Sequence, residues 1–509
     1  MSRLPKNRAW FVGATLVAVL GFAACSDDED DTAGTAGTGG GPAGQGGMPP
    51  GGEGGEGTAM GGTRAGMSGS SGAAGEGRGG DEAGGGGGDG GAAGSHAGQG
   101  GEGNIDDSVR AELAGMSPLP ALPVDTTNMY ADSAAAAAFG QRLFFDEKFS
   151  GPLKIASDLG GVGATQKISC KSCHGTPVVL DDDRSNPDTV SIGADVHTRN
   201  SPALTNSAFY TWTNWGGRFA SQWELPLAVV ESGVIMNGNR LALAHRIFDV
   251  YKADYEGVFG AGSLLAEIGS DAERFPPAGK PKASAVDPDG DWEKMAAGDR
   301  TIVNRILVNY SKAIQAYLRK LVNRTSPFDA FMAGDDDAIS ASAKRGALLF
   351  SNLGCRNCHD GPTFSDQGFH DLGGPQTGPN VPATDDGRFV DAARLSASTM
   401  NIDSDFSDDK TTGKLAGLAT IPDSWKGAFR TSSLRGVAAS APYMHSGQLA
   451  TLSDVIDFYA QGPNANARAG EALVPFTISA DEKAELIAFL ETLTSGPVAA
   501  ALLVDTAAP

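Results

Sequence analysis

The sequence is poor in cysteine, in basic residues and in long apolar runs. Its 509 residues include 5 Cys, and 39 Lys and Arg stand against 61 Asp and Glu, for a formal net charge of −22. This balance argues against nucleic acid as a partner, because phosphate binding needs clustered Lys and Arg. No apolar run reaches about 18 residues, which excludes a polytopic membrane protein. Alternating apolar and polar residues are also scarce, which favours a mainly helical fold.

Glycine is abundant, but it is concentrated in one segment. Of the 72 glycines, 34 lie between Ser26 and Asn104, together with 12 acidic residues and 2 arginines. Without apolar residues, this segment cannot bury enough surface to offset the entropy lost on ordering it. We therefore expect residues 25–104 to form a disordered, acidic tether. About 400 residues remain beyond it, enough for large folded cores.

The N-terminus has the features of an export signal. Basic residues precede an apolar stretch over residues 10–24 that is short for a membrane span. The stretch ends in Gly-Phe-Ala-Ala-Cys, which resembles the lipobox of bacterial lipoproteins. We expect residues 1–24 to be a signal peptide and Cys25 to carry lipid, with a plain secretory signal as the alternative. The predicted location is the cell envelope, either periplasmic or tethered to the outer membrane, with the lipid anchor as the only membrane contact.

The remaining chain carries helix signals and a weak internal repeat. Asp299 precedes a long run of apolar residues at three- and four-residue steps, and Thr451 and Ser479 begin capping-box patterns. Gly140 and Gly346 each begin a Gly-x-x-Leu-Phe sequence. These patterns predict a mainly α protein with two related domains, at residues 105–333 and 334–509, each holding one cofactor.

Four of the five cysteines lie in two Cys-x-x-Cys-His motifs. The motifs are Cys170-Lys-Ser-Cys173-His174 and Cys355-Arg-Asn-Cys358-His359. Two thiols at this spacing can form thioethers with the two vinyl groups of one haem, and the adjacent His then reaches the iron. No other cysteine pair is available to complete a zinc site. The sequence therefore predicts two covalent c-type haems with His174 and His359 as proximal ligands.

Further motifs follow in order along residues 139–495. They are Gly140-Gln-Arg-Leu-Phe-Phe-Asp146, Arg199-Asn-Ser-Pro-Ala-Leu-Thr-Asn206, Trp215-Gly-Gly-Arg218, Ser326-Pro-Phe-Asp329, Gly361-Pro-Thr-Phe-Ser-Asp366, Ser433-Leu-Arg-Gly436 and Ala441-Pro-Tyr-Met-His445. With these motifs the chain resembles the bacterial di-haem cytochrome c peroxidases, a family that includes the MauG enzymes. The resemblance implies two cytochrome c-like helical domains, with a peroxidatic haem in the first and an electron-transfer haem in the second.

The resemblance also implies roles for single residues. The family's Trp between the haems matches Trp215, with core packing as the alternative. Tyr459 stands where the peroxidases have a Met ligand and the MauG enzymes have Tyr, and it is otherwise a buried helix residue. A phenolate ligand would lower the potential of that haem. A calcium site matches Asn200 with the backbone carbonyls of Ser440 and Pro442, and the alternative is an unoccupied turn.

The chain departs from the family on the peroxide side of the first haem. The family's Gln and Glu, ten and twenty residues after the bridging Trp, are replaced by Leu225 and Ile235. Loss of a general acid–base group lowers a rate by about 10²–10⁴-fold. Glu231 lies one helical turn before Ile235 and is one candidate substitute, or else a surface residue. His197 is the other, as a distal acid–base, a sixth iron ligand or a plain loop residue.

Three functions follow from these features. The leading one is a peroxidase that uses hydrogen peroxide at the His174 haem, with electrons relayed from the His359 haem through Trp215. Its electron donor would be a small periplasmic protein, either a cytochrome c or a cupredoxin, and the family resemblance also admits a homodimer. The alternatives are MauG-like oxidation of a protein substrate and a non-catalytic electron-transfer cytochrome, which Leu225 and Ile235 favour.

Overall fold

The computed structural model describes residues 104–187, 189–261, 264–462 and 473–508. The predicted signal peptide, Cys25 and the tether up to residue 103 lie outside the described residues. Among the described residues, no helix is long and apolar enough to cross a membrane. The mainly helical fold is confirmed, because strand is limited there to the antiparallel pair β1 (Phe369–His370) and β2 (Phe429–Arg430).

The helices are short, apart from α4 and α7. They are α1 (Ile105–Glu112), α2 (Ala134–Phe145), α3 (Glu224–Glu231), α4 (Arg240–Phe259), α5 (Leu265–Ile268), α6 (Asp291–Lys294), α7 (Ala297–Leu318), α8 (Pro327–Met332), α9 (Ala341–Asn352), α10 (Arg388–Ala397), α11 (Leu452–Gln461) and α12 (Ala480–Thr492). Short 3₁₀ turns also occur, and two of them, η2 (Cys170–Ser172) and η5 (Cys355–Asn357), each contain the first cysteine of a Cys-x-x-Cys-His motif.

The predicted caps of two helices are confirmed, and one start is shifted. Thr451 and Ser479 each accept a hydrogen bond from the backbone N–H three residues later, which caps α11 and α12. Helix α7 begins before Asp299, which lies in its first turn with Ala296 at the cap. A carboxylate is favourable there as well, because it faces the positive end of the helix dipole.

A first core forms around α2, α3, α4 and α7. Aromatic side chains fill it, among them Phe139, Trp223 and Tyr310, each no more than 2% exposed. Helix α10 and the turn η6 (Lys414–Leu418), although late in the chain, add apolar side chains to this core. Helix α2 crosses α7 so closely that a Cβ on Gly140 would lie 1.9 Å from the carbonyl oxygen of Ala313.

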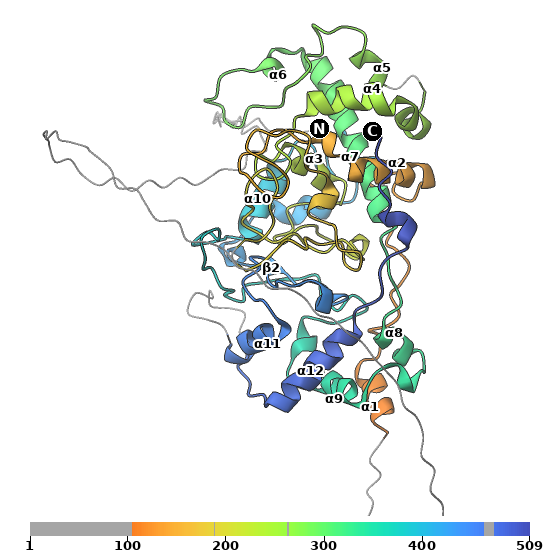
Figure 1. Cartoon of the computed structure of the whole chain (residues 1–509), viewed down its shortest axis with the longest axis vertical. Coiled ribbons are helices and arrows are strands. Elements are labelled where there is room, and N and C mark those ends of the chain that lie inside the picture. Colours follow the sequence, from red (N-terminus) through yellow and green to blue (C-terminus); the bar gives the residue numbers. More distant parts are fainter. Residues whose placement is uncertain (1–103, 188, 262–263, 463–472, 509) are drawn as a thin grey trace, which may run out of the picture. The chain divides into compact units, whose positions relative to one another are not determined.

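A second core forms from α1, α8, α9, α11 and α12, and Figure 1 shows α1 beside α9. A Cβ on Gly346 would lie 1.9 Å from the carbonyl oxygen of Glu485, so α9 crosses α12 as α2 crosses α7. The two glycines of the sequence repeat therefore hold equivalent positions in two helix pairs. Because α1 joins the second core and α10 the first, the chain crosses between the cores, and the division at residues 333 and 334 stays a prediction.

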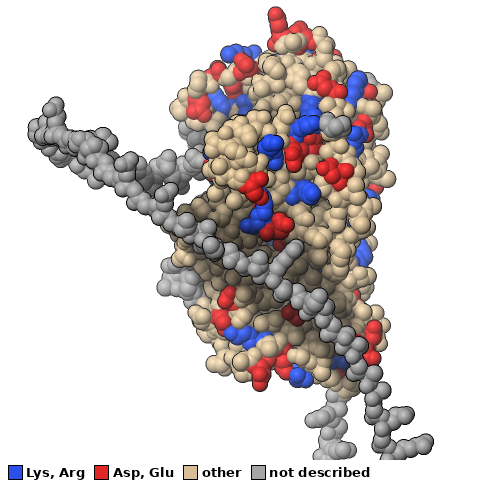
Figure 2. Space-filling view, viewed as in Figure 1, with Lys and Arg blue, Asp and Glu red and all other residues tan. Residues whose placement is uncertain are grey.

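The face shown in Figure 2 carries charged side chains of both signs. Among the described residues on this face, Lys and Arg are interspersed with Asp and Glu. The segment from residue 26 to 104, with 12 acids and 2 arginines, supplies −10 of the −22 net charge. The acidic balance of the chain therefore owes much to residues that precede the described part of the structure.

Candidate haem sites and their junction

The first Cys-x-x-Cys-His motif forms a single turn, and a backbone carbonyl orients its histidine through the Nδ1 atom. Cys170 and Cys173 are free thiols. The His174 Nδ1 lies 3.0 Å from the carbonyl oxygen of Leu180. Since a carbonyl only accepts, Nδ1 carries the proton, and the lone pair of Nε2 is left to bind a metal. Burial lowers the pKa of His174, which keeps the imidazole in this neutral form.

The second motif repeats the arrangement. Cys355 and Cys358 are free, and the His359 Nδ1 lies 3.0 Å from the carbonyl oxygen of Phe364. Burial lowers the pKa of this histidine too. Leu180 and Phe364, which accept the two bonds, both adopt left-handed backbone angles, with φ of 54° and 52°. Such angles are uncommon for bulky residues and occur where the surroundings require them.

Both motifs therefore fit a covalent haem. Each offers two unpaired thiols and one neutral imidazole oriented by its second nitrogen, which is the donor set of a c-type site. Among the described residues, Cys358, Asp366 and His370 also form a cluster able to hold a metal ion. Thioether formation would consume Cys358 and leave the Asp366–His370 pair, whose oxygen and nitrogen lie 2.8 Å apart.

The loop after His359 is fixed by the segment that follows β2. Ser433 donates to the carbonyl of Thr363, and Ser365 donates to the carbonyl of Thr431, each at 2.6 Å. Two motifs that lie about 70 residues apart in the sequence thus meet as one unit. Their contact positions the Phe364 carbonyl that orients the histidine.

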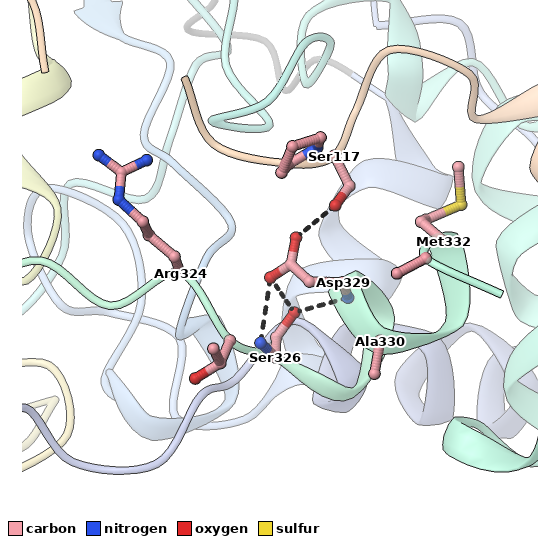
Figure 3. Close-up of a pocket in the computed structure, with 9 residues that line it drawn as sticks. Ser117, Arg324, Ser326, Asp329, Ala330 and Met332 are labelled. Atoms are coloured by element: carbon pink, nitrogen blue, oxygen red, sulfur yellow. Dashed lines mark hydrogen bonds between the residues drawn. The ribbon is translucent and has the colours of Figure 1, made fainter. Parts of the chain in front are cut away.

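The Ser326-Pro-Phe-Asp329 motif lies at a pocket whose lining contains no residue of the two Cys-x-x-Cys-His motifs. The pocket, about 360 Å³, lies against the start of α8, and Figure 3 shows the Asp329 carboxylate held by Ser117 and Ser326. Arg435 pairs with the same carboxylate at 2.8 Å and 3.0 Å. Because three partners already engage Asp329, it stabilises the fold around α8 and is not free to bind a ligand in the pocket.

Trp215 lies where the two haem-binding parts of the chain meet. Its indole N–H donates to the carbonyl of Asn200 at 2.7 Å, and its own carbonyl accepts from the backbone N–H of Arg430 at 2.8 Å. Asn200 in turn donates from its side chain to the carbonyl of Pro442 at 2.8 Å. The structure thus brings the predicted bridging residue together with two of the three predicted calcium ligands. The third, Ser440, directs its hydroxyl to the Val437 carbonyl at 3.1 Å.

The turn of Trp215 has a counterpart that sequence reasoning missed. Isolated antiparallel bridges join Thr213 to Phe219 and Tyr443 to Leu449. The residue before Trp215 and the residue before His445 both have left-handed φ angles, of 72° and 71°. His445 therefore occupies in the second half the place that Trp215 occupies in the first. The spacing of the turn glycines, Gly217 and Gly447, was the available signal.

His445 is buried in contacts of its own. Its ring stacks on Phe429, with centroids 3.6 Å apart, and its Nε2 lies 2.8 Å from the side-chain nitrogen of Gln376. Burial lowers the pKa of His445 to about 4. Nearby, Arg199 forms ion pairs with Asp385 and Asp391 at 2.6 Å and 2.7 Å. Neither acid was identified from the sequence, since the charge pairing becomes visible only in three dimensions.

The loop of His197 runs beside the turn of Ile235. The backbone N–H of Ala194 donates to the Ile235 carbonyl at 2.7 Å, and that of Asp195 to the Val234 carbonyl at 3.0 Å. The His197 Nδ1 lies 3.0 Å from the backbone nitrogen of Arg199 and 2.9 Å from the carbonyl oxygen of the same residue. Nδ1 can accept from the first or donate to the second, so either neutral tautomer has a partner. His197 and Ile235 are both half-buried, and the role of His197 on the peroxide side stays a prediction.

The carboxylate of Glu231, the other candidate for proton transfer, forms an ion pair with Arg240. Arg240 binds both of its carboxylate oxygens, with the guanidinium Nε at 2.9 Å. A catalytic role for Glu231 stays a prediction, and it would require this ion pair to open. Glu224, which no sequence pattern singled out, is 3% exposed and accepts from the backbone N–H groups of Ala220 and Ile402 at 2.6 Å and 2.7 Å. Burial raises the pKa of Glu224 to about 8.

Tyr459 lies on α11 and is half-buried. Burial raises the pKa of its phenol, and electrostatic interaction with Cys355 and Cys358 raises it further. Its role as an iron ligand stays a prediction.

Comparison with known proteins agrees with this arrangement. Residues 134–337 match the model of the di-haem cytochrome c peroxidase family. The chain is 31% identical to cytochrome-c peroxidase IdrP1 of Denitromonas iodatirespirans, over 75% of this chain and 87% of the relative. It is 27% identical to the methylamine utilization protein MauG of Methylorubrum extorquens, over 72% and 80%.

A solved structure has the same fold. The diheme peroxidase BthA of Burkholderia thailandensis matches with a TM-score of 0.51 at 21% identity, over 74% of this chain and 95% of that one. The shared fold thus spans nearly the full length of that protein. Together with the relatives in sequence, this similarity shows that the chain belongs to the family of di-haem cytochrome c peroxidases, and is a peroxidase-like oxidoreductase with two c-type haems.

Proposed function

We propose that the chain reduces hydrogen peroxide at the His174 haem, with electrons delivered through the His359 haem and Trp215. When bound, each haem supplies an iron that changes oxidation state. The observation that carries the proposal is the position of Trp215, which is hydrogen-bonded to Asn200 on one side and to Arg430 on the other. Since Arg430 adjoins the segment that fixes the His359 loop, Trp215 connects the two parts of the chain.

His197 is the residue we propose for proton transfer on the peroxide side. Leu225 and Ile235 have no proton to give or take. His197 lies on the loop that packs against the Ile235 turn, and its Nδ1 has a partner in the Arg199 backbone in either neutral tautomer. An imidazole can take up a proton and donate it to a departing oxygen. Glu231 is the weaker candidate because Arg240 already neutralises it.

Tyr459 is proposed as the second ligand of the His359 haem. Its phenol interacts electrostatically with both cysteines of that motif, and burial holds it protonated, with a raised pKa, until a metal replaces the proton. A phenolate favours ferric iron, so this haem would have a lower potential than one with Met. Calcium is proposed between Asn200 and Pro442, whose side-chain amide and backbone carbonyl are hydrogen-bonded to each other. To bind the ion, Asn200 would turn its amide oxygen, in place of its nitrogen, toward it, and oxygen atoms are the ligands that calcium prefers.

The proposed location is the cell envelope, with Cys25 lipidated and the Gly-rich segment as a tether. The export-type N-terminus supports it, and so does covalent haem attachment, which is typical of exported cytochromes. The electron donor is proposed to be a small periplasmic redox protein. Labelling with radioactive palmitate tests the anchor, because Cys25→Ser should abolish label incorporation.

A second candidate function is MauG-like oxidation of a protein substrate. The observation that favours it is Tyr459, since Tyr occupies this position in the MauG enzymes and Met in the peroxidases. In that case the electrons would leave a protein partner instead of a small reduced cytochrome. Trp215 would again carry them.

Steady-state peroxide turnover with a reduced small cytochrome tests the leading proposal. We expect measurable turnover by the wild type and a loss of about 10²-fold in His197→Ala, the lower end of general acid–base effects. Glu231→Gln distinguishes the two candidates and should retain most of the activity, because the ion pair with Arg240 keeps the Glu231 carboxylate from proton transfer. Absence of turnover in a protein that carries both haems would reject the peroxidase and leave the MauG-like reaction or electron transfer.

A further inference from the structure

Five arginines are buried in the described part of the chain. They are Arg240, Arg319, Arg388, Arg430 and Arg435. Three of them form ion pairs with carboxylates of the chain. Arg388 and Arg430 form none with the described residues, and the Nε of each has no hydrogen-bond partner there. A buried guanidinium without an anion is strongly unfavourable. The carboxylate of Asp391 acts on Arg388, whereas no acid of the described residues acts on Arg430, which therefore calls for a negative charge from outside the chain.

Arg430 is the less satisfied of the two. Arg388 donates to two backbone carbonyls, of Gly216 and Gly217, at 3.2 Å and 2.7 Å. Arg430 is 5% exposed, and its Nη1 donates to the carbonyl of Thr431 at 3.2 Å. The guanidinium lies over the ring of Tyr210, 3.9 Å from the centroid, which offers no formal charge while the phenol is protonated. Burial lowers the pKa of Arg430, and the phenol of Tyr210, its hydrogen-bonding neighbour, only partly opposes that shift.

The position of Arg430 relates it to one haem. Its backbone N–H donates to the carbonyl of Trp215 at 2.8 Å. The next residue, Thr431, accepts from the hydroxyl of Ser365, which lies six residues after His359 on the loop that orients it. Arg430 therefore lies between the junction tryptophan and the loop that holds the second proximal histidine.

The cofactor of this family carries anions of its own. A haem bears two propionate carboxylates, and a guanidinium is the side chain best suited to bind a carboxylate through parallel N–H bonds. We propose that Arg430 binds a propionate of the His359 haem and raises the reduction potential of that haem. The inference deepens the proposed function, on which it rests, by assigning a cofactor-binding residue that lies outside the Cys-x-x-Cys-His motif.

The effect on the potential follows from charge. Reduction adds an electron to the haem, and a nearby positive charge favours the reduced state. A unit charge at roughly 10 Å and an effective dielectric constant of about 20 changes the equilibrium constant for reduction on the order of tenfold. A tenfold change corresponds to about 59 mV for one electron.

Spectroelectrochemical titration of the full-length holoprotein tests the proposal. Arg430→Gln should lower the reduction equilibrium constant of the His359 haem about tenfold, or about 59 mV. Arg430→Lys, which keeps the charge, should retain most of the potential. Arg319→Gln is the matched control, since Arg319 is equally buried but has its own partner in Asp132. The Cys170→Ser variant should carry only the His359 haem, so its titration identifies which of the two reduction steps of the wild type belongs to that haem.

Each outcome decides the question. A shift in Arg430→Gln alone, or loss of the second haem in Arg430→Gln but not in Arg430→Lys, supports the propionate contact. The proposal is overturned if, in Arg430→Gln, the reduction equilibrium constants of both haems stay within twofold of the wild-type values. It is equally overturned if Arg319→Gln shifts the potential of the His359 haem as much as Arg430→Gln does. It is also overturned if the wild-type potential follows added chloride, because the partner would then be an exchangeable ion. Haem content by pyridine haemochrome, measured on the same samples, separates these results from failure of the two-haem assignment.

Discussion

Alanine at Gly346 should damage one haem site and leave the other intact. The new Cβ would lie 1.9 Å from the carbonyl oxygen of Glu485 and 2.5 Å from its carbon, both backbone atoms of α12. Because real contacts of this kind exceed about 3 Å, α9 and α12 would have to separate by about 1 Å. Overpacking of this kind destabilises by about 1–3 kcal/mol, and we expect the upper end, since the neighbour is backbone and cannot rotate away.

Alanine at Gly140 should disturb the other helix pair, α2 and α7. Its Cβ would lie 1.9 Å from the carbonyl oxygen of Ala313 on α7. Pyridine haemochrome and thermal unfolding of each variant are the assays. We expect Gly346→Ala to lose the Cys355 haem first and Gly140→Ala the Cys170 haem first. Gly298→Ala is the control in α7, because its Cβ meets nothing within 4 Å, and it should stabilise by up to about 1 kcal/mol. If Gly346→Ala and Gly140→Ala both keep the melting temperature and haem content of the wild type, the close approach of α9 to α12 and of α2 to α7 would be refuted.

Three further predictions address the haem environment and a buried acid. Tyr459→Met should raise the potential of the His359 haem and change its ligand-field bands. An unaltered low-spin spectrum in Tyr459→Phe would rule Tyr459 out as an iron ligand. Ile235→Glu with Leu225→Gln should increase peroxide turnover on the order of 10²-fold, and no gain with both haems bound would indicate a closed pocket. Burial raises the pKa of Glu224 to about 8, above its value in the unfolded chain, so the stability that its protonation contributes is present at low pH and lost as the pH rises toward 8. Glu224→Gln should remove this pH dependence of the free energy of unfolding, which denaturant unfolding curves measure. The dependence amounts to about 1.4 kcal/mol for each pH unit between the pKa of Glu224 in the unfolded chain and that in the folded chain. A variant with the same pH profile as the wild type would contradict the raised pKa of Glu224.

The sequence alone was sufficient wherever chemistry depends on neighbouring residues. Five consecutive residues, twice, predict haem attachment, because two thiols and an imidazole at that spacing need only one turn of backbone. The caps at Thr451 and Ser479 are local for the same reason, as each involves a side chain and an N–H three residues later. The glycines of the repeat were visible too, although their purpose was not.

Tertiary structure decided what depends on residues distant in the chain. It placed α1 in the second core, engaged Glu231 with Arg240, and set His445 in the turn equivalent to that of Trp215. It also left Arg430 buried without a carboxylate from the described residues. Charge pairing and burial depend on which segments meet in space, and no local pattern records a contact between residues some two hundred positions apart. For that reason the haem-attachment residues could be identified from the sequence, while the surroundings that tune the two haems could not.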